Sequence, residues 1–117
     1  MVQITERKRG KKRKARAEIP VGAMVEDIVG CKWSLSVLKL IRDGTIRPGA
    51  MQRAVPGLST KVLNERLRKL LRYGIIDKLV FPEVPPRVEY RLTEYGRKFD
   101  ALIENIDTLQ DWLTQRR

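Results

Sequence analysis

The 117-residue sequence contains no histidine and a single cysteine, Cys31. Without histidine there can be no Ser-His-Asp triad, Cys-His dyad or imidazole metal ligand, and one cysteine can form neither a zinc ribbon nor an intrachain disulfide. No paired carboxylates stand at a recognisable catalytic spacing, and no Gly-rich phosphate loop follows a strand. We therefore expect no enzyme, no metal site and no cofactor.

Long apolar runs are missing as well. No stretch approaches the ~18 apolar residues that span a bilayer, and the first residues lack the apolar segment of a signal peptide. These absences predict a cytoplasmic protein without a membrane partner. Hydrophobic residues make up 42% and charged residues 33% of the chain, a composition that suits one small folded domain with its own core and excludes global disorder.

Positive charge is concentrated near the N-terminus. Residues 1–20 carry eight basic and two acidic residues, a net charge of +6, which leaves +5 of the total +11 for the other 97 residues. This run predicts a basic flexible arm over 1–20 and a folded domain over 21–117. A nucleic acid is favoured over anionic lipid as the partner of the arm, because the arm has no aromatic or Leu residue to insert into a membrane. Charge that only keeps the chain in solution is the alternative.

Apolar spacing and end signals predict four helices before any strand. Gly44 ends the second helix, Pro48 lies in the first turn of the third, Ser59 caps the fourth and Gly74 closes it. The expected ranges are 21–30, 32–42, 48–55 and 60–73.

The next segments, 75–81 and 87–92, have strand composition, and a proline-rich loop joins them into a hairpin. In the second strand Val88, Tyr90 and Leu92 alternate with Arg87, Glu89 and Arg91, so one side is expected to pack and the other to meet solvent or a partner. Helices followed by such a hairpin form a winged helix-turn-helix. The expected fold class is α+β, mainly α, with a two-stranded β-hairpin wing; a small α+β domain without a ligand is the alternative.

Thr93 can cap a final helix, 94–114, whose apolar residues repeat at the spacing of a coiled-coil seam. The seam, widened by two neighbours, consists of Tyr95, Phe99, Leu102, Ile103, Ile106, Leu109, Trp112 and Leu113. It is longer than one small domain is expected to cover, so the sequence predicts a long dimerisation helix and a homodimer. The alternative is that this helix packs against the first helix of the same chain. Both can hold, because one face of the helix can pack on its own chain and another can form the dimer.

The fourth helix gathers its leucines on one side and polar side chains on the other. Such polar residues contact bases and phosphates, and the predicted DNA contacts of this helix are Ser59, Thr60, Lys61, Asn64, Glu65, Arg68 and Arg72. Arg87 at the hairpin tip, with Arg91 behind it, is expected to reach the flanking backbone or minor groove. The alternatives are a solvated helix face, since Glu65 and Lys69 can pair, and basic residues that only protect a strand edge.

Four separated motifs, in consistent order from about Val21 to the C-terminus, carry a resemblance. They are Gly30-Cys31-Lys32-Trp33-Ser34, residues 58–67, Gly74-Ile75-Ile76, and residues 84–93 with Gly96. Together they resemble the HxlR-type family of winged helix-turn-helix transcription regulators. The resemblance implies a dimeric DNA-binding regulator, usually a repressor, with the helix from Ser59 as recognition helix and the terminal helices as dimer interface.

The cysteine departs from that family pattern. A redox-sensing subset of the family carries a cysteine just before the first helix, where this sequence has Ile19 and Pro20. Cys31 instead replaces the second glycine of a Gly-Gly-Lys-Trp motif at the expected start of the second helix. A helix N-terminus beside Lys32 can lower a thiol pKa, so Cys31 is a candidate redox thiol. A small buried residue is the favoured alternative.

These observations predict a homodimer that binds specific double-stranded DNA near the nucleoid, with two recognition helices in successive major grooves. The alternative is a nonspecific architectural nucleoid protein whose binding depends on the basic arm.

Overall fold

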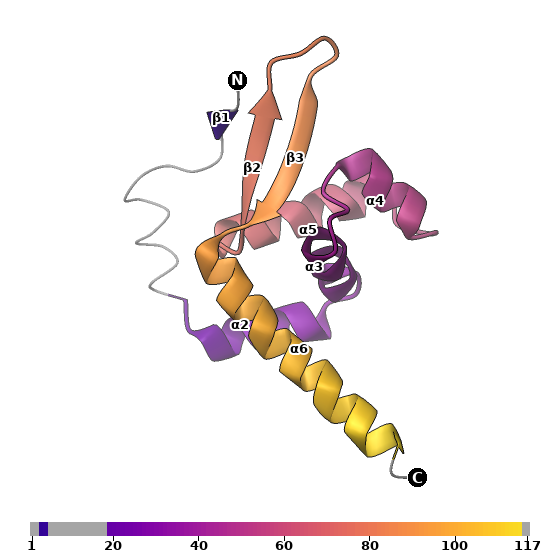
Figure 1. The fold of residues 1–117 in the computed structure, drawn as a ribbon, viewed down its shortest axis with the longest axis vertical. Helices are drawn as coiled ribbons and strands as arrows, with labels where there is room; N and C mark the ends of the chain where they lie inside the picture. Colours follow the sequence, from indigo (N-terminus) through magenta and orange to yellow (C-terminus); the bar gives the residue numbers. More distant parts are fainter. Residues whose placement is uncertain (1–2, 5–18, 116–117) are drawn as a thin grey trace.

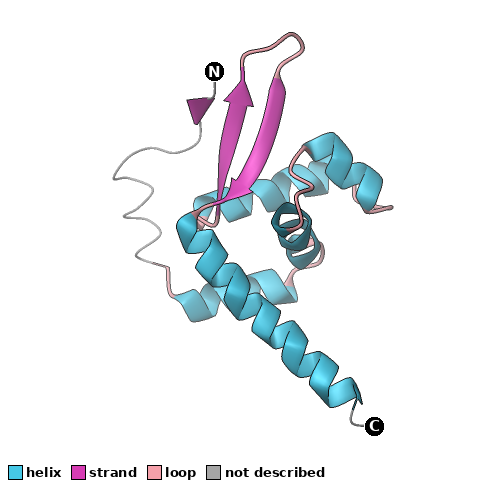
Figure 2. Cartoon of the chain, viewed as in Figure 1, coloured by secondary structure: helices cyan, strands magenta, loops and turns pink. Residues whose placement is uncertain are grey.

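The computed structural model describes residues 3–4 and 19–115, and it places helices around a projecting β-hairpin (Figures 1 and 2). The elements in chain order are β1 (Gln3–Ile4), α2 (Val21–Gly30), α3 (Ser34–Arg42), α4 (Pro48–Ala54), α5 (Thr60–Arg72), β2 (Ile76–Phe81), β3 (Arg87–Leu92) and α6 (Glu94–Gln115). The predicted helices and both strands of the hairpin are confirmed, with ends that shift by at most two residues, and the mainly helical winged fold is confirmed with them.

Helix ends follow the chemistry of the sequence. The Ser59 hydroxyl accepts a hydrogen bond from the Val62 backbone N–H at 3.1 Å and thereby caps α5. Gly74 follows α5 with a φ of 77°, a conformation that glycine adopts without strain. The Thr93 hydroxyl accepts from the Gly96 N–H at 2.8 Å and begins α6. These caps fix where α5 and α6 start.

The sheet is antiparallel, and β2 pairs with β3 from Ile76↔Leu92 to Phe81↔Arg87. β1 adds a third strand on the outer edge of β2, with Gln3 opposite Val80. The two-stranded wing is thus extended by a pairing that the sequence analysis did not predict. Residues 1–2 and 5–18 of the predicted flexible arm, 1–20, lie outside the described residues.

The core is formed by one face of each long helix and by the base of the hairpin. Its fully buried members include Met24 and Ile28 of α2, Val37 and Leu38 of α3, Met51 of α4, Leu63, Leu67 and Leu70 of α5, and Ile103 of α6. A Cβ added at Gly96 would lie 1.9 Å from the Ile75 carbonyl oxygen, so α6 passes directly against the start of β2. This close approach sets the position of α6 on the domain.

Ion pairs join α6 to α3. Arg42 donates to both carboxylate oxygens of Asp100, at 2.8 and 2.9 Å, and Asp100 is only 5% exposed. One turn earlier on α3 and two turns later on α6, Lys39 pairs with Asp107 at 2.9 Å. The two-point Arg42–Asp100 pair is geometrically specific, and together the two pairs hold α6 along α3 as far as Asp107. α6 continues past them towards the C-terminus (Figure 1).

Two predictions about side-chain faces need correction. Phe99 and Ile103, assigned to the dimer seam, are 4% and 0% exposed, because α6 turns these positions into the core of their own chain. Tyr95 packs against the same core and its hydroxyl lies 3.4 Å from Met24 Sδ. Glu89, expected on the open side of β3, is 7% exposed.

No helix in the part of the chain that the structure describes could cross a membrane, and no group of metal-binding side chains occurs there.

Candidate nucleic-acid interface

The helix-turn-helix consists of α4, a turn and α5. Gly57 turns the chain with a φ of 91°, and Leu58 beyond it is buried. Across the turn the Gln52 side-chain amide donates to the Thr60 hydroxyl at 3.0 Å. This bond ties α4 to the first turn of α5, so the two helices present one continuous surface.

The inner flank of α5, which faces α2 and α3, uses two basic residues to hold the fold. The Arg66 Nε donates to the Lys32 carbonyl oxygen at 2.8 Å, and the Lys69 ammonium donates to Asp27 at 2.9 Å. These charges therefore have partners within the chain. Both side chains are held against the domain, and they are only 18% and 17% exposed.

Asp27 is the centre of this inner flank. It accepts hydrogen bonds from the Tyr73 hydroxyl and from Lys69. These two donors, Tyr73 first, outweigh burial and lower the pKa of Asp27 below its ordinary value. Burial acts to lower the pKa of Lys69, but its bonds to Asp27 and Cys31 raise it on balance. The network therefore favours a charged carboxylate beside a charged ammonium.

The outer flank of α5 faces solvent. Its residues, all exposed, are Thr60, Lys61, Asn64, Glu65, Arg68 and Arg72, preceded by the exposed Ser59. Within the described residues, neither Lys61 nor Arg68 pairs with a carboxylate, while Arg72 lies 5.7 Å from the centre of the Tyr73 ring. The structure thus brings together on one surface the α5 residues that the sequence analysis selected.

A cleft of about 360 Å³, here called the helix–wing cleft, separates α5 from the hairpin. Asn64 and Arg68 line it from α5, and Lys78 and Tyr90 line it from the strands. Lys78 was missing from the predicted contacts, although its place opposite Tyr90 in the strand register puts it on the side of the hairpin that faces α5. Two basic residues therefore face one another across the cleft.

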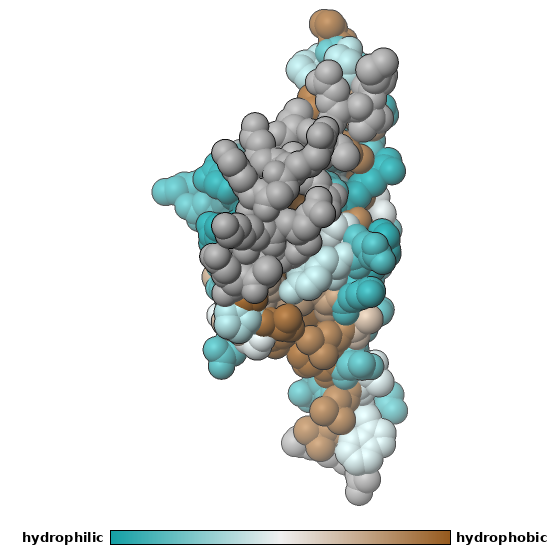
Figure 3. Space-filling model, turned by 90° about the vertical axis from the view of Figure 1, so that its left-hand side faces the viewer, coloured by the Kyte–Doolittle hydropathy of each residue, from teal (hydrophilic) through white to brown (hydrophobic). Residues whose placement is uncertain are grey.

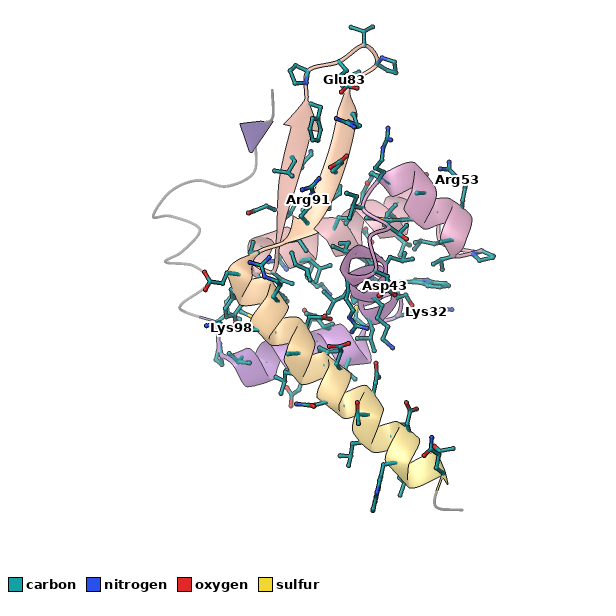
Figure 4. The ribbon with its side chains drawn as sticks, in the orientation of Figure 1. Lys32, Asp43, Arg53, Glu83, Arg91 and Lys98 are labelled. Carbon is teal, nitrogen blue, oxygen red and sulfur yellow. The ribbon has the colours of Figure 1, made fainter. Side chains whose placement is uncertain are left out.

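The wing arginines are less free than predicted. Arg87 is the first residue of β3 and half-buried, with its guanidinium 3.9 Å from the centre of the Phe81 ring. It pairs with Glu83 at 3.1 Å and Glu89 at 3.7 Å, and Arg91 pairs with Glu89 at 2.8 Å. Figure 4 shows Glu83 at the tip of the hairpin and Arg91 nearer its base. The ion pairs with Glu89 therefore hold both guanidinium groups against β3.

The remainder of the predicted dimer seam is exposed. Its members are Leu102, Ile106, Leu109, Trp112 and Leu113, each between 40% and 67% exposed. The last four line a shallow hollow of about 390 Å³ on α6. Figure 3 shows apolar side chains gathered over the lower part of the molecule towards the C-terminal end of the chain. Patches of this kind on soluble domains mark interaction surfaces.

Cys31 lies between α2 and α3, three residues before α3 begins. Trp33 takes a left-handed φ of 76° just before that helix, so Cys31 is not at the helix N-terminus that the sequence analysis expected. Its sulfur accepts from Lys69 at 3.3 Å, which makes the thiol part of the inner flank of α5.

Comparison with known proteins agrees with this geometry. The model of the HxlR-like helix-turn-helix family matches residues 28–117. The uncharacterised HTH-type transcriptional regulator sll1512 of Synechocystis sp. is 46% identical over 92 residues, which cover 78% of this chain and 68% of the relative. The uncharacterised HTH-type transcriptional regulator YtcD of Bacillus subtilis is 35% identical over 91 residues, covering 78% of this chain and 71% of the relative.

Among solved structures, the reduced form of the transcriptional regulator YodB from B. subtilis superimposes with a TM-score of 0.69 at 29% identity. The match covers 80% of this chain and 91% of that chain. The sequence and the fold therefore both have relatives that are named as transcriptional regulators.

Proposed function

We propose that this chain, which belongs to the HxlR-like helix-turn-helix family of transcriptional regulators, is a homodimer. The dimer binds specific double-stranded DNA and represses transcription. The family consists of DNA-binding regulators rather than enzymes. In this proposal α5 enters the major groove and the hairpin contacts the flanking backbone or minor groove.

The observation that carries the proposal is the division of the polar residues of α5. Arg66 and Lys69 have partners inside the chain, whereas Lys61 and Arg68 face solvent without a carboxylate partner among the described residues. A fold that needed these outer charges for its own stability would pair them as it pairs the inner ones. Arg, Lys and Asn on one exposed helix face are the side chains that contact guanine, phosphate and adenine.

The glutamate on the same face contributes to selectivity. Glu65 lies 4.0 Å from an Arg66 guanidinium nitrogen and is otherwise exposed. A carboxylate accepts a hydrogen bond from the amino group of cytosine but repels phosphate. Glu65 therefore opposes nonspecific binding and favours a sequence that offers a donor at its position.

The exposed part of α6 supports the homodimer. Its apolar residues lie beside and beyond the last ion pair with α3, and the rest of the domain leaves them at least 40% exposed. A second copy of the same helix would bury a like surface by two-fold symmetry. Two α5 helices would then address half-sites spaced by about one turn of DNA, ~34 Å, or a multiple.

Selection from a random duplex library with the full chain tests the proposal. We expect a roughly two-fold motif, and binding to the selected duplex that exceeds binding to a scrambled duplex by about 10³-fold or more at the same salt concentration. Equal affinity for both duplexes would reject sequence-specific regulation.

Removing the positive charge of the basic arm distinguishes a specific regulator from an architectural DNA-binding protein. Its eight basic residues can be changed to Gln, which leaves the β1 sequence Gln3-Ile4 intact. A specific regulator should keep its preference for the selected duplex while its affinity depends less steeply on salt. An architectural protein should lose most of its binding.

A further inference from the structure

A second cavity lies further along the hairpin, between the first turn of α4 and the start of β3. Its volume is about 610 Å³, and three arginines line it, Arg47, Arg53 and Arg87. The described residues that line the cavity include no carboxylate. Only Arg87 of these three is among the predicted DNA contacts. Arg47, just before α4, and Arg53, within it, are two cationic side chains with no assigned role.

The fold of α4 brings Arg47 and Arg53 to the same cavity. Arg47 precedes Pro48 and is extended, as residues before proline usually are. Arg53 folds back along α4, so that a Cβ built on Gly49 would lie 3.4 Å from its Nη1 atom. Because Gly49 has no side chain, the guanidinium can lie beside the first turn. Figure 4 shows Arg53 at the upper edge of α4.

Arg47 and Arg53 are both exposed. Neither forms a salt bridge with a carboxylate in the described part of the chain. Like charges that converge on one cavity repel each other unless an anion occupies it. An anion in the cavity would replace this repulsion with attraction.

Arg87 brings a third guanidinium to the cavity. Its Nε atom is shielded from solvent, and its other nitrogens pair with Glu83 and Glu89, so Arg87 is held in place at the cavity wall. The planar guanidinium is the side chain best suited to phosphate, and Arg47 and Arg53 offer two more that have no carboxylate partner among the described residues.

The position of the cavity indicates which phosphate it binds. Val88, at the cavity, and Tyr90, in the helix–wing cleft, are two residues apart and so project from the same face of β3. The two hollows thus follow one another along the hairpin. When α5 lies in the major groove and the wing over the neighbouring minor groove, the DNA strand between the grooves passes along this face.

We propose that the cavity formed by Arg47, Arg53 and Arg87 binds one phosphate group of the DNA backbone in each half-site. The inference rests on the DNA binding of the proposed function, but not on its sequence preference. The site extends the interface from α5 onto α4 and positions the duplex without reading its bases.

The double substitution Arg47→Gln with Arg53→Gln tests this site. Affinity should fall about tenfold on both the selected and the scrambled duplex, so their ratio should not change. The slope of log affinity against log salt should become shallower by about 1 per half-site, because the two arginines share one phosphate. Unchanged affinity and slope would overturn the proposal. A fall confined to the selected duplex would also overturn it, because it would indicate base readout.

The matched control removes two positive charges from the start of α6, by Arg97→Gln with Lys98→Gln. Both residues are exposed, and Arg97 makes only a 3.4 Å contact with the Leu92 carbonyl oxygen. Figure 4 places Lys98 on α6, away from α4 and Arg53. This variant should bind both duplexes within about twofold of the unmodified chain. A fall equal to that of the α4 variant would show that net charge, rather than the cavity, determines affinity.

A scan with single methylphosphonates, which each remove one phosphate charge, locates the contact. One neutral position per half-site should weaken the unmodified chain about tenfold and leave the α4 variant unaffected.

Inorganic phosphate is the second probe, with the Arg53 Nε–H resonance as its readout. If phosphate shifts that resonance while the α4 substitutions leave DNA affinity intact, the cavity takes a small phosphate compound and the DNA assignment is wrong. If the unmodified chain binds the two duplexes equally, the proposed sequence-specific function is wrong. The phosphate site is then still tested by comparing the salt dependence of binding of the unmodified chain with that of the α4 variant.

Discussion

The two flanks of α5 carry the same residue types but use them differently. On the inner flank, Lys69 and Arg66 bond to Asp27 and to the Lys32 carbonyl oxygen. On the outer flank, Lys61 and Arg68 face solvent with no carboxylate partner among the described residues. A basic residue on a helix therefore indicates a ligand contact only where the fold does not already use its charge in an internal hydrogen bond or ion pair.

The last helix repeats this division along its length. Its first half is committed to the domain through Phe99, Ile103 and the Arg42–Asp100 pair. Its second half exposes Leu109 and Trp112, which are 67% and 53% exposed. We therefore expect substitutions on committed surfaces to reduce stability and substitutions on open surfaces to reduce assembly or binding.

The largest expected effect is on a committed surface, at Gly96. Gly96→Ala would place a Cβ 1.9 Å from the Ile75 carbonyl oxygen, and separation of α6 from β2 should lower the free energy of unfolding by about 3 kcal/mol or more. Gly22→Ala is the control, because nothing lies within 4 Å of that position; it should be neutral or stabilise by up to about 1 kcal/mol. Urea denaturation measures both, and equal stability of the two variants would refute the close approach.

The next effect is on the inner flank. Asp27→Ala leaves the Tyr73 hydroxyl and the Lys69 ammonium without their acceptor, which should cost about 1–3 kcal/mol of unfolding free energy. Affinity of the folded variant for DNA should not change. Because the native pKa of Asp27 is lowered, its contribution is present above about pH 4 and is lost as the pH falls through the native pKa. A stability difference between unmodified chain and variant that persisted undiminished at pH 2 would contradict this account.

The open half of α6 is tested by Leu109→Glu, which puts a charge on the exposed apolar stripe. The dimer should dissociate at least tenfold more readily, equivalent to about 1.4 kcal/mol, while monomer stability changes by less than about 0.5 kcal/mol. Sedimentation equilibrium at micromolar concentration gives the measurement. Thr108→Glu adds the same charge beside the stripe and should leave the dimer intact. A single 13.6 kDa species for the unmodified chain would reject the homodimer.

The smallest expected effect is on the outer flank, at Lys61. Lys61→Ala should make the salt slope shallower by about 1 per half-site and weaken all duplexes alike, because a lysine near the start of α5 contacts phosphate rather than bases. Thermal unfolding should be unchanged. Fluorescence anisotropy over a series of salt concentrations measures the slope, and a changed base preference would place Lys61 among the reading residues instead.

Local signals in the sequence predicted the fold well. Ser59 and Thr93 fix helix starts through their side-chain hydroxyls, and Pro48 does so through its ring. The alternation around Val88 and Tyr90 identifies a strand. These features depend on neighbours a few residues away, so a single sequence contains them.

Long-range relations could not be predicted in the same way. The burial of Phe99 and Ile103 depends on the path that α6 takes past Ile75. The cavity at Arg47 and Arg53 exists because α4 meets the hairpin, about 40 residues away in the chain. On α5 the exposed set was predicted correctly because a helix has only one buried side, whereas the partners of Lys69 and Arg66 come from distant segments.

The most direct test of the central claim, that the outer flank of α5 reads base sequence, compares the motifs selected by the unmodified chain and by Arg68→Ala, with Lys98→Ala as the control. We expect Arg68→Ala to lose preference at one base pair per half-site, worth about 1–3 kcal/mol, while its stability and the rest of its motif stay the same. Lys98→Ala should select the unmodified motif. An Arg68→Ala motif identical to that of the unmodified chain at every position would contradict the account.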